Sequence, residues 1–265
     1  AMINALYYQL KTSSAVNLQY RAANLIWLIG AVLEPLIYLV VWDTVAKAQG
    51  GSVEGFTTSD FAAYFIALMV VDRLTFTWIM WEYEFMIREG TLARRLMRPL
   101  HPFWVDLADN IAYKSFIMVV LIPTVILLSF FFHPSFQTTV LDFVAFLPAL
   151  VLAFILRFCL EWGLAMSAFW TTRTNAINQV YFVIFLFFSG RLAPLELLPG
   201  PIQVLAGLLP FRWMLSFPIE VLLGQHTGQA IVTGYTIQLA WTAAVVGAML
   251  LAWRISIKQF SAVGS

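Results

Sequence analysis

Charged residues are scarce in this chain of 265 residues: Asp, Glu, Lys and Arg make up only 11%, and hydrophobic residues make up 61%. Soluble domains carry about 25% charged residues. A soluble globule of this length could not bury so much apolar surface and still cover itself with polar groups. Disorder is excluded as well, because disordered chains combine low hydrophobicity with high net charge. The composition therefore predicts that most of the chain lies in lipid.

Motifs that would indicate catalysis are also missing. The one cysteine, Cys159, excludes an internal disulfide and a cysteine-based zinc site. The three histidines lie apart without metal-ligand spacing, none of the four lysines follows a glycine as a Walker A loop requires, and no Gly-x-Ser-x-Gly elbow occurs. The net charge of +1 gives no basic field for nucleic acid. We therefore expect no catalytic residue, no metal site, no cofactor bound by this chain and no nucleic-acid partner.

Long hydrophobic runs are what the sequence does contain. Crossing a hydrocarbon core of about 30 Å takes about 20 helical residues. Six segments are apolar enough to be spans, although the fifth is short at fifteen residues. No internal repeat is visible, so we predict one transmembrane domain over residues 1–265. The predicted fold is an all-α membrane protein with six spans, near residues 23–42, 61–81, 111–132, 143–170, 176–190 and 230–253.

Two further segments are apolar without being continuous spans. Ile3, Leu6, Tyr7 and Leu10 recur at helical spacing, which is typical of a helix lying in the membrane interface. The segment 191–224 holds five of the eleven prolines, yet it stays rich in leucine and phenylalanine. Because a lipid-exposed span cannot contain such breaks, we expect short helices in the outer leaflet, packed against protein, before the last span.

The distribution of basic residues predicts the orientation, because cytoplasmic loops of membrane proteins are enriched in Lys and Arg. With both termini in the cytoplasm, nine basic residues lie inside and three outside, and Lys114 is expected to reach the inner interface as well. We therefore predict a multi-pass protein of the inner (plasma) membrane with both termini cytoplasmic. The inside residues are Lys11, Arg21, Arg88, Arg94, Arg95, Arg98, Arg173, Arg254 and Lys258, and the outside residues are Lys47, Arg191 and Arg212.

Besides Lys114 near one end of the third span, five charged residues lie inside the predicted spans, where each is costly. Arg157 and Glu161 are four residues apart, hence on one helical face, and are expected to pair. Asp72 and Arg73 point about 100° apart on a helix, so we expect each to need a partner on another helix. Glu34 has no partner near it in the sequence. Two interpretations stay open: a polar pathway or conformational latch, and structural hydrogen bonds between helices.

The loop of residues 84–102, between the second and third predicted spans, is strongly basic. Gly90 is expected to end the preceding helix, Thr91 to cap a new one and Pro99 to stop it. Such a loop could simply lie against anionic lipid headgroups, and a short amphipathic helix is also what a cytoplasmic partner could grip. Its predicted apolar side comprises Leu92, Leu96 and nearby Ile87, and the arginines around it are Arg94, Arg95 and Arg98.

These residues resemble a known family. The order Ile87-Arg88-Glu89-Gly90-Thr91-Leu92, then Leu96-Met97-Arg98-Pro99-Leu100, is similar to the first cytoplasmic loop of bacterial type-two ABC export permeases. A second resemblance, to the region before the last span of that family, comprises Phe188-Ser189-Gly190, Ala193-Pro194-Leu195, Leu198-Pro199, Leu209-Pro210-Phe211, Pro218-Ile219 and Leu223-Gly224. With the six spans and the interfacial helix, the resemblance covers nearly the whole chain.

The resemblance implies a half-transporter. Two permeases, identical or related, would pair, and two separate ABC ATPase subunits, which bind ATP and Mg, would dock below them. A substrate pathway would lie between the permeases, lined by their first, second and fifth spans. The implied ATPase-coupling residues are Ile87, Arg88, Glu89, Gly90, Leu92, Arg95, Leu96 and Arg98. The predicted pathway or intramembrane polar residues are Glu34, Asp72, Arg73, Arg157 and Glu161, and those of an outer gate are Phe188, Pro194, Pro199, Pro210 and Phe211.

The predicted function is export of a hydrophobic or amphiphilic substrate, as in multidrug efflux, driven by ATP that partner subunits hydrolyse. Glu34 and Asp72 would suit a cationic amphiphile. An ion-coupled secondary transporter or channel is an alternative, because it also uses intramembrane carboxylates, but it usually shows a repeat between its halves. A membrane-embedded enzyme is a third possibility, against which the scattered histidines argue.

Overall fold

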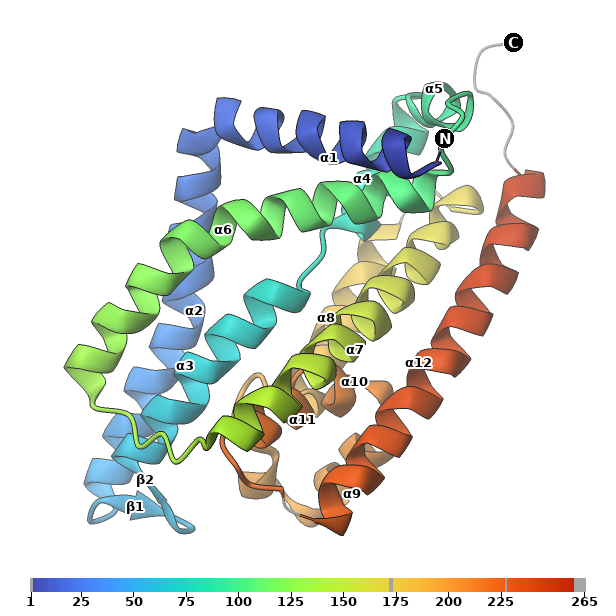
Figure 1. Ribbon diagram of the computed structural model, residues 1–265. Coiled ribbons are helices and arrows are strands. Elements are labelled where there is room, and N and C mark those ends of the chain that lie inside the picture. Colours follow the sequence, from blue (N-terminus) through green and yellow to red (C-terminus); the bar gives the residue numbers. More distant parts are fainter. Residues whose placement is uncertain (1, 172–173, 227, 260–265) are drawn as a thin grey trace.

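The computed structural model describes residues 2–171, 174–226 and 228–259, which form a helical bundle (Figure 1). Arg173, which was counted for the orientation, and the side chain of Ile3 lie outside the described residues. The longer helices are α1 Met2–Gln19, α2 Arg21–Ala48, α3 Thr58–Thr75, α6 Pro102–Phe132, α7 Val140–Ala165, α8 Thr174–Phe188 and α12 Gln229–Ser256. The shorter ones are α4 Ile79–Arg88, α5 Leu92–Leu96, α9 Gly200–Leu208, α10 Pro210–Met214 and α11 Ser216–Leu222. Strands β1 Ser52–Val53 and β2 Phe56–Thr57 pair as a hairpin, and the 3-10 turns are η1 Met166–Phe169, η2 Leu195–Leu197 and η3 Ile257–Gln259.

Helices long enough to cross a membrane account for much of the chain. Among the described residues, four helical stretches have the length and apolar composition for this: Thr58–Arg88, Pro102–Phe132, Val140–Phe169 and Gln229–Ser256. They correspond to the predicted second, third, fourth and sixth spans. The predicted fifth span is the shorter apolar helix α8, and the predicted first span lies within the 28 residues of α2. The chain is therefore an all-α membrane protein.

The predicted second span is not one continuous helix. α3 ends at Thr75, residues 76–78 are not helical, and α4 begins at Ile79. Phe76 leaves the helical conformation with ψ 141°, although neither glycine nor proline stands at the break. The sequence analysis missed this interruption because the apolar run continues through it.

The proline-rich segment has the predicted short helices. α9, α10 and α11 contain nine, five and seven residues. Pro201 and Pro210 lie in the first turns of α9 and α10, where the missing backbone N–H of proline costs nothing. α10 and α11 pack against α7 and are almost entirely buried.

The bundle is organised around α7, which packs against α3, α4, α11 and α12. Trp162, near the end of α7, is among the largest fully buried side chains. α1 lies along the first half of α6, as Figure 1 shows. Gln9 Nε2 of α1 donates a hydrogen bond of 3.0 Å to Asp109 of α6, and Ser13 donates a second one. α1 is therefore fixed to the bundle by polar contacts.

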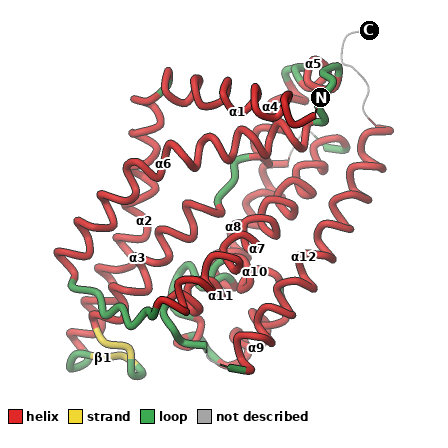
Figure 2. Tube along the Cα trace, viewed as in Figure 1, coloured by secondary structure: helices red, strands yellow, loops and turns green. Residues whose placement is uncertain are grey.

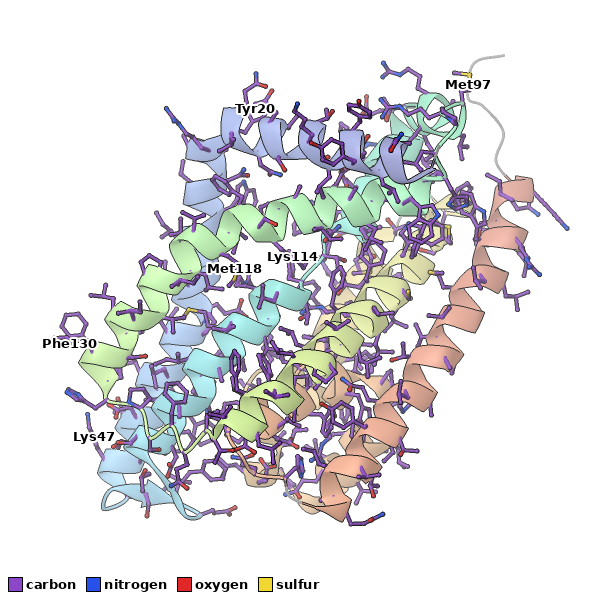
Figure 3. All side chains as sticks on the ribbon, in the orientation of Figure 1. Tyr20, Lys47, Met97, Lys114, Met118 and Phe130 are labelled. Carbon is purple, nitrogen blue, oxygen red and sulfur yellow. The ribbon has the colours of Figure 1, made fainter. Side chains whose placement is uncertain are left out.

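The two ends of the bundle carry different elements. The beginning of α1, the short helix α5 and the end of α12 lie at one end, and the β1–β2 hairpin and α9 lie at the other (Figures 1 and 2). Met97, after α5, and Lys47, near the end of α2, mark these opposite ends in Figure 3. This arrangement separates a basic end from an end built of a hairpin and short helices.

Candidate functional sites

The first candidate site is a network of three carboxylates and three arginines, which we call the ionic network. Its centre is Asp72 of α3, which is fully buried. Asp72 Oδ1 lies 2.9 Å from Arg157 Nη1 of α7 and 3.3 Å from Arg191 Nη1, and Asp72 Oδ2 accepts a hydrogen bond from Arg73. A buried charge is tolerated only when such partners replace its water.

The predicted pair of Arg157 and Glu161 is present. Arg157 Nε donates to Glu161 Oε1 at 2.9 Å, and both side chains are almost fully buried. Glu161 also accepts hydrogen bonds from the Tyr181 hydroxyl of α8 at 2.9 Å and from Thr77 in the break after α3. The guanidinium of Arg157 lies 4.4 Å from the ring centre of Phe185, a cation–π contact. The pair thus joins α7 to α8 and to the α3–α4 connection.

Arg191 completes the ionic network. Its Nε and Nη2 donate to Glu34 Oε1 and Oε2 at 3.0 and 2.7 Å, a bidentate pair between α2 and the segment after α8. Arg191, predicted among the outside charges, is not an exposed loop charge, because the residue is only 4% exposed. Glu34 therefore has the partner that the nearby sequence does not contain.

The expectation that each of Asp72 and Arg73 needs a partner on another helix is confirmed for Asp72 and wrong for Arg73, which pairs with Asp72 itself. The flexible stem of Arg73 folds back so that its guanidinium reaches Asp72 and lies 5.1 Å from the Phe76 ring centre. The ionic network therefore balances three negative and three positive groups. No excess negative charge is left on Asp72 or Glu34 to attract a cationic substrate.

Lys114 of α6 compensates the break between α3 and α4. Its Nζ donates to the Phe76 carbonyl at 2.8 Å and to Asn110 Oδ1 at 3.2 Å, and it lies 4.6 Å from the ring centre of Phe154. Lys114 is labelled in Figure 3. The prediction that Lys114 extends to the interface is wrong, because the side chain is 9% exposed. An unpaired carbonyl inside a membrane costs several kcal/mol, and the Lys114 ammonium removes that cost.

The second candidate site is α5 with its flanking residues, at the basic end. Gly90 comes directly after Glu89, the C-cap residue of α4. It has φ +66°, a left-handed conformation that suits glycine, and it ends the helix as predicted. Thr91 precedes α5 but makes no capping hydrogen bond; its hydroxyl donates instead to the Met86 carbonyl at 3.4 Å.

The apolar side of α5 faces the bundle and not the solvent. Leu92 is fully buried, and Leu96 is half-buried against the same core. The expectation that these leucines form a face for a partner is therefore not met in this structure, because they hold α5 in place. The exposed residues at this end include Arg88, Glu89, Arg94, Met97 and Arg98, and Met97 is 78% exposed.

Arg95 clamps α5 to α6 and, through it, to three other helices. Its Nη2 lies 2.6 Å from Asp106 Oδ1 and 3.2 Å from Asp109 Oδ2. Asp106 also accepts hydrogen bonds of 2.9 Å from Tyr83 of α4 and Trp162 of α7, and Asp109 binds α1. Burial of Arg95 alone would lower the pKa of its guanidinium, but the neighbouring carboxylates, Asp106 first, raise it above its ordinary value. The sequence analysis missed both aspartates, whose signal was their position in the first turns of the helix that follows the basic loop.

The predicted outer-gate residues do not all come together. Pro194, Pro210 and Phe211 are buried, whereas Phe188 is half-buried and Pro199 is exposed. The Phe211 ring lies 6.1 Å from that of Tyr181, which bonds Glu161 of the ionic network. One gate residue thus touches the ionic network through α8.

Beside these residues lies a polar cluster that the sequence analysis did not single out. Glu220 of α11 is buried and accepts hydrogen bonds from Ser216 at 2.6 Å and Arg212 at 2.9 Å. His226 Nε2 lies 2.6 Å from the same carboxylate. Burial raises the pKa of Glu220, but the contacts with His226, Arg212 and Ser216 outweigh it and lower the pKa below its ordinary value.

Comparison with protein families gives one match. The family model described as "ABC-2 family transporter protein" matches residues 32–264, which include the ionic network, α5 and the proline-rich segment. None of the curated proteins compared matches the chain. Since the family model covers most of the sequence, the chain belongs to the ABC-2 transporter family, whose members are the membrane permease components of ABC transporters and are not themselves catalytic.

Proposed function

We propose that this chain is the permease of an ABC exporter, which moves a hydrophobic or amphiphilic substrate out of the cytoplasm. Family membership implies ABC ATPase subunits as partners; in the proposal two of them bind ATP and Mg and hydrolyse the ATP. A second permease, identical or related, completes the pathway. The chain crosses the inner (plasma) membrane six times, through α2, the α3–α4 pair, α6, α7, α8 and α12. Both termini lie in the cytoplasm, at the end that carries α5.

The observation that carries this proposal is the way α5 is held. It projects arginines and Met97 outward while Leu92 and Arg95 attach it to the bundle. A helix that merely rested on lipid headgroups would not need a buried ion pair to Asp106 and a second, half-exposed one to Asp109. The attachment suits a helix that receives force from a docked subunit and passes it on.

Arg95 and its aspartates supply a route for that force. A displacement of α5 acts on Asp106 and Asp109 of α6, and from there on Tyr83 of α4, Trp162 of α7 and α1. α4 leads to the break at residues 76–78, and α7 carries Arg157 and Glu161. Both routes therefore end at the ionic network, where a small shift would exchange discrete ion pairs.

In the proposal the ionic network acts as a latch and the buried outer residues act as a gate. The balance of charges supports a latch better than an open polar pathway, because every carboxylate of the network already has an arginine partner. Phe211, against Tyr181, would transmit opening of the latch to the outer helices.

The exposed apolar faces of α2 and α8 support pairing with a second permease. Ile26 and Trp27 of α2 are 70% and 68% exposed, and Val180 and Val183 of α8 are 60% and 56% exposed. Such faces contact either lipid or protein inside a membrane. In the proposal part of this surface lies at the pathway between the two permeases.

One observation favours the second candidate function, an ion-coupled secondary transporter. Helices broken near the middle of the membrane form ion sites in such proteins, and the α3–α4 pair is broken. The site would need a carboxylate free to bind an ion, however, and Asp72, Glu161 and Glu34 are each held by an arginine. Transport that persists without any ATPase subunit would decide for this alternative.

Co-purification tests the proposed function. The permease is isolated from its native membrane in mild detergent, and bound proteins are quantified together with ATP hydrolysis. We expect an ABC ATPase subunit at about one copy per permease, since two of each form the complex. A monodisperse permease that repeatedly lacks any ATPase and transports without ATP would contradict the proposal.

A further inference from the structure

A hollow of about 550 Å³ lies beside α4 and α8, outside the ionic network. Its walls include the rings of Trp78, Trp81 and Phe85 and the carboxylates of Glu82 and Glu84. This volume is in the range of about 300–1,000 Å³ that small-molecule sites occupy. The hollow lies directly after the break that follows α3. Because α4 continues from there towards α5, the hollow lies towards the basic end of the bundle.

The aromatic walls present open ring faces. Trp78 and Trp81 stack with ring centres 4.4 Å apart, and Trp27 of α2 lies 6.1 Å from Trp78. Trp78 is 48% exposed and Phe85 is 54% exposed. Tryptophans commonly anchor proteins at the membrane interface, and that role explains the rings but not the two carboxylates that line the same space.

The charges of the hollow differ from those of the ionic network. Among the described residues, the Glu82 carboxylate makes no hydrogen bond or ion pair and only feels Arg95 and Asp109 at longer range. Glu84 accepts one hydrogen bond, from Thr174. Arg88 also lines the hollow, but its guanidinium lies over Phe85 at 5.9 Å and pairs with the exposed Glu89 at 3.8 Å. The described lining residues therefore carry a net charge of −1, from two carboxylates and one arginine.

We propose that this hollow is a binding site for lipophilic organic cations, which makes such cations a substrate class of the transporter. The inference rests on the proposed function for the statement that they are transported. Aromatic faces attract cations. A carboxylate without an ionic partner, next to apolar surface, binds most favourably a cation that itself carries apolar groups. Glu82 and the Trp78–Trp81 pair supply these features together. The cationic selectivity first expected of Glu34 and Asp72 belongs instead to Glu82.

Two ions of matched shape and opposite charge test the site directly. Saturable binding of tetraphenylphosphonium and of tetraphenylborate is measured on the purified permease in lipid nanodiscs, without ATPase subunits. We expect saturable binding of the phosphonium and not of the borate. Glu82→Gln and Trp78→Leu should each weaken phosphonium binding about tenfold, the size of one charged or cation–π contact in a partly dry site.

Controls separate the proposal from its alternatives. Both variant positions are exposed, so the proteins should fold and remain monodisperse. Glu54→Gln, in the hairpin at the opposite end, should bind as the wild type does. Equal affinity for both ions, or unchanged phosphonium affinity in Glu82→Gln and Trp78→Leu, would overturn the proposal. Loss of phosphonium binding when two permeases dimerise would also overturn the proposal, because a second permease would then fill the hollow. The binding assay contains no ATPase subunit. It can therefore fail while co-purification of an ATPase still supports the proposed function, and it can succeed while no ATPase co-purifies.

Discussion

Arg157 is held from three directions, by Asp72 of α3, by Glu161 of its own helix and by the ring of Phe185. Each contact replaces water that the guanidinium loses on burial. Because the compensation comes from partners on different helices, removing one charge leaves others unpaired where water does not reach them. The energetic role of each residue therefore depends on the whole ionic network.

Replacing Arg157 tests this dependence. Arg157→Met leaves Glu161 with only hydroxyl partners, and breaking a buried pair costs about 3–5 kcal/mol. We expect a lower thermal midpoint in detergent and a lower folded yield. The double variant Arg157→Met/Glu161→Leu removes both charges and should recover much of the loss. Arg94→Met, at an exposed position of α5, is the control and should stay within about 0.5 kcal/mol of the wild type. Equal stability of the single and double variants would show that the two residues do not stabilise each other.

Glu220 gives the protein a pH-dependent contribution to stability. The pKa of Glu220 in the folded protein is lower than its ordinary value of 4.5, so the unfolded chain binds the proton more readily. The stabilisation by the charged carboxylate is therefore complete above pH 4.5, and it is lost as the pH falls through the pKa of the folded state. Glu220→Gln should be less stable than the wild type by about 1–2 kcal/mol at neutral pH. The gap between their unfolding midpoints should narrow below about pH 4.5. A gap that stayed constant down to pH 3 would contradict the charged state of this carboxylate.

Single residues also show what the sequence could and could not reveal. The pair of Arg157 and Glu161 was predictable, because residues four positions apart lie next to each other on the same face of a helix. Arg191 meets Asp72 across 119 positions of sequence, and no local pattern encodes such a contact. Its proximity to prolines made it resemble an outside loop charge. Only the packing of α2, α3 and the segment after α8 brings these residues together.

At the scale of helices, tertiary contacts override local preference in two places. The break after α3 occurs in an apolar run without glycine or proline, and it persists because Lys114 and Glu161 bind groups of the broken segment. α5 was predicted as an amphipathic helix with its leucines outward. The leucines pack against the bundle instead, because packing there removes their apolar surface from water. Helix boundaries set by Gly90 and by the prolines followed local rules and were predictable.

Gly90→Ala tests how much the connection between α4 and α5 depends on backbone conformation. An added Cβ would meet no atom within 4 Å, so the cost comes only from φ +66°. We expect a loss of about 1 kcal/mol, or about 2–4 °C in thermal midpoint for a chain of this size. Gly90→Asn should lose less, because asparagine tolerates this conformation.

The control for this glycine is Gly30→Ala in α2. Gly30 also has open space around an added Cβ, but its φ is not positive. No loss of stability is expected there. A loss at Gly30 equal to that at Gly90 would mean that the added methyl group, and not the left-handed backbone, is responsible.

At the scale of the whole molecule, the packing of the helices joins the α5 end to the middle of the bundle. Arg95 fixes α5 to α6, Asp106 connects α6 to α4 and α7, and both of these helices reach the ionic network. The composition and the loop motif predicted a membrane permease, and the loop sequence predicted a short helix between Thr91 and Pro99. They could not predict this route, because its links are contacts between residues far apart in sequence.

The proposed function depends above all on an ATPase subunit that docks on the exposed side of α5. The most direct test compares retention of the ATPase subunit, and the ATP hydrolysis that substrate stimulates, in two permease variants. Met97→Asp places a carboxylate at the most exposed apolar position of this end, where a docked subunit would deprive it of water. Glu54→Lys changes charge in the hairpin at the opposite end. We expect Met97→Asp to fold normally but to lose the subunit and the stimulated hydrolysis, whereas Glu54→Lys should keep both. Full retention and stimulation in Met97→Asp, or loss in Glu54→Lys alone, would contradict this expectation.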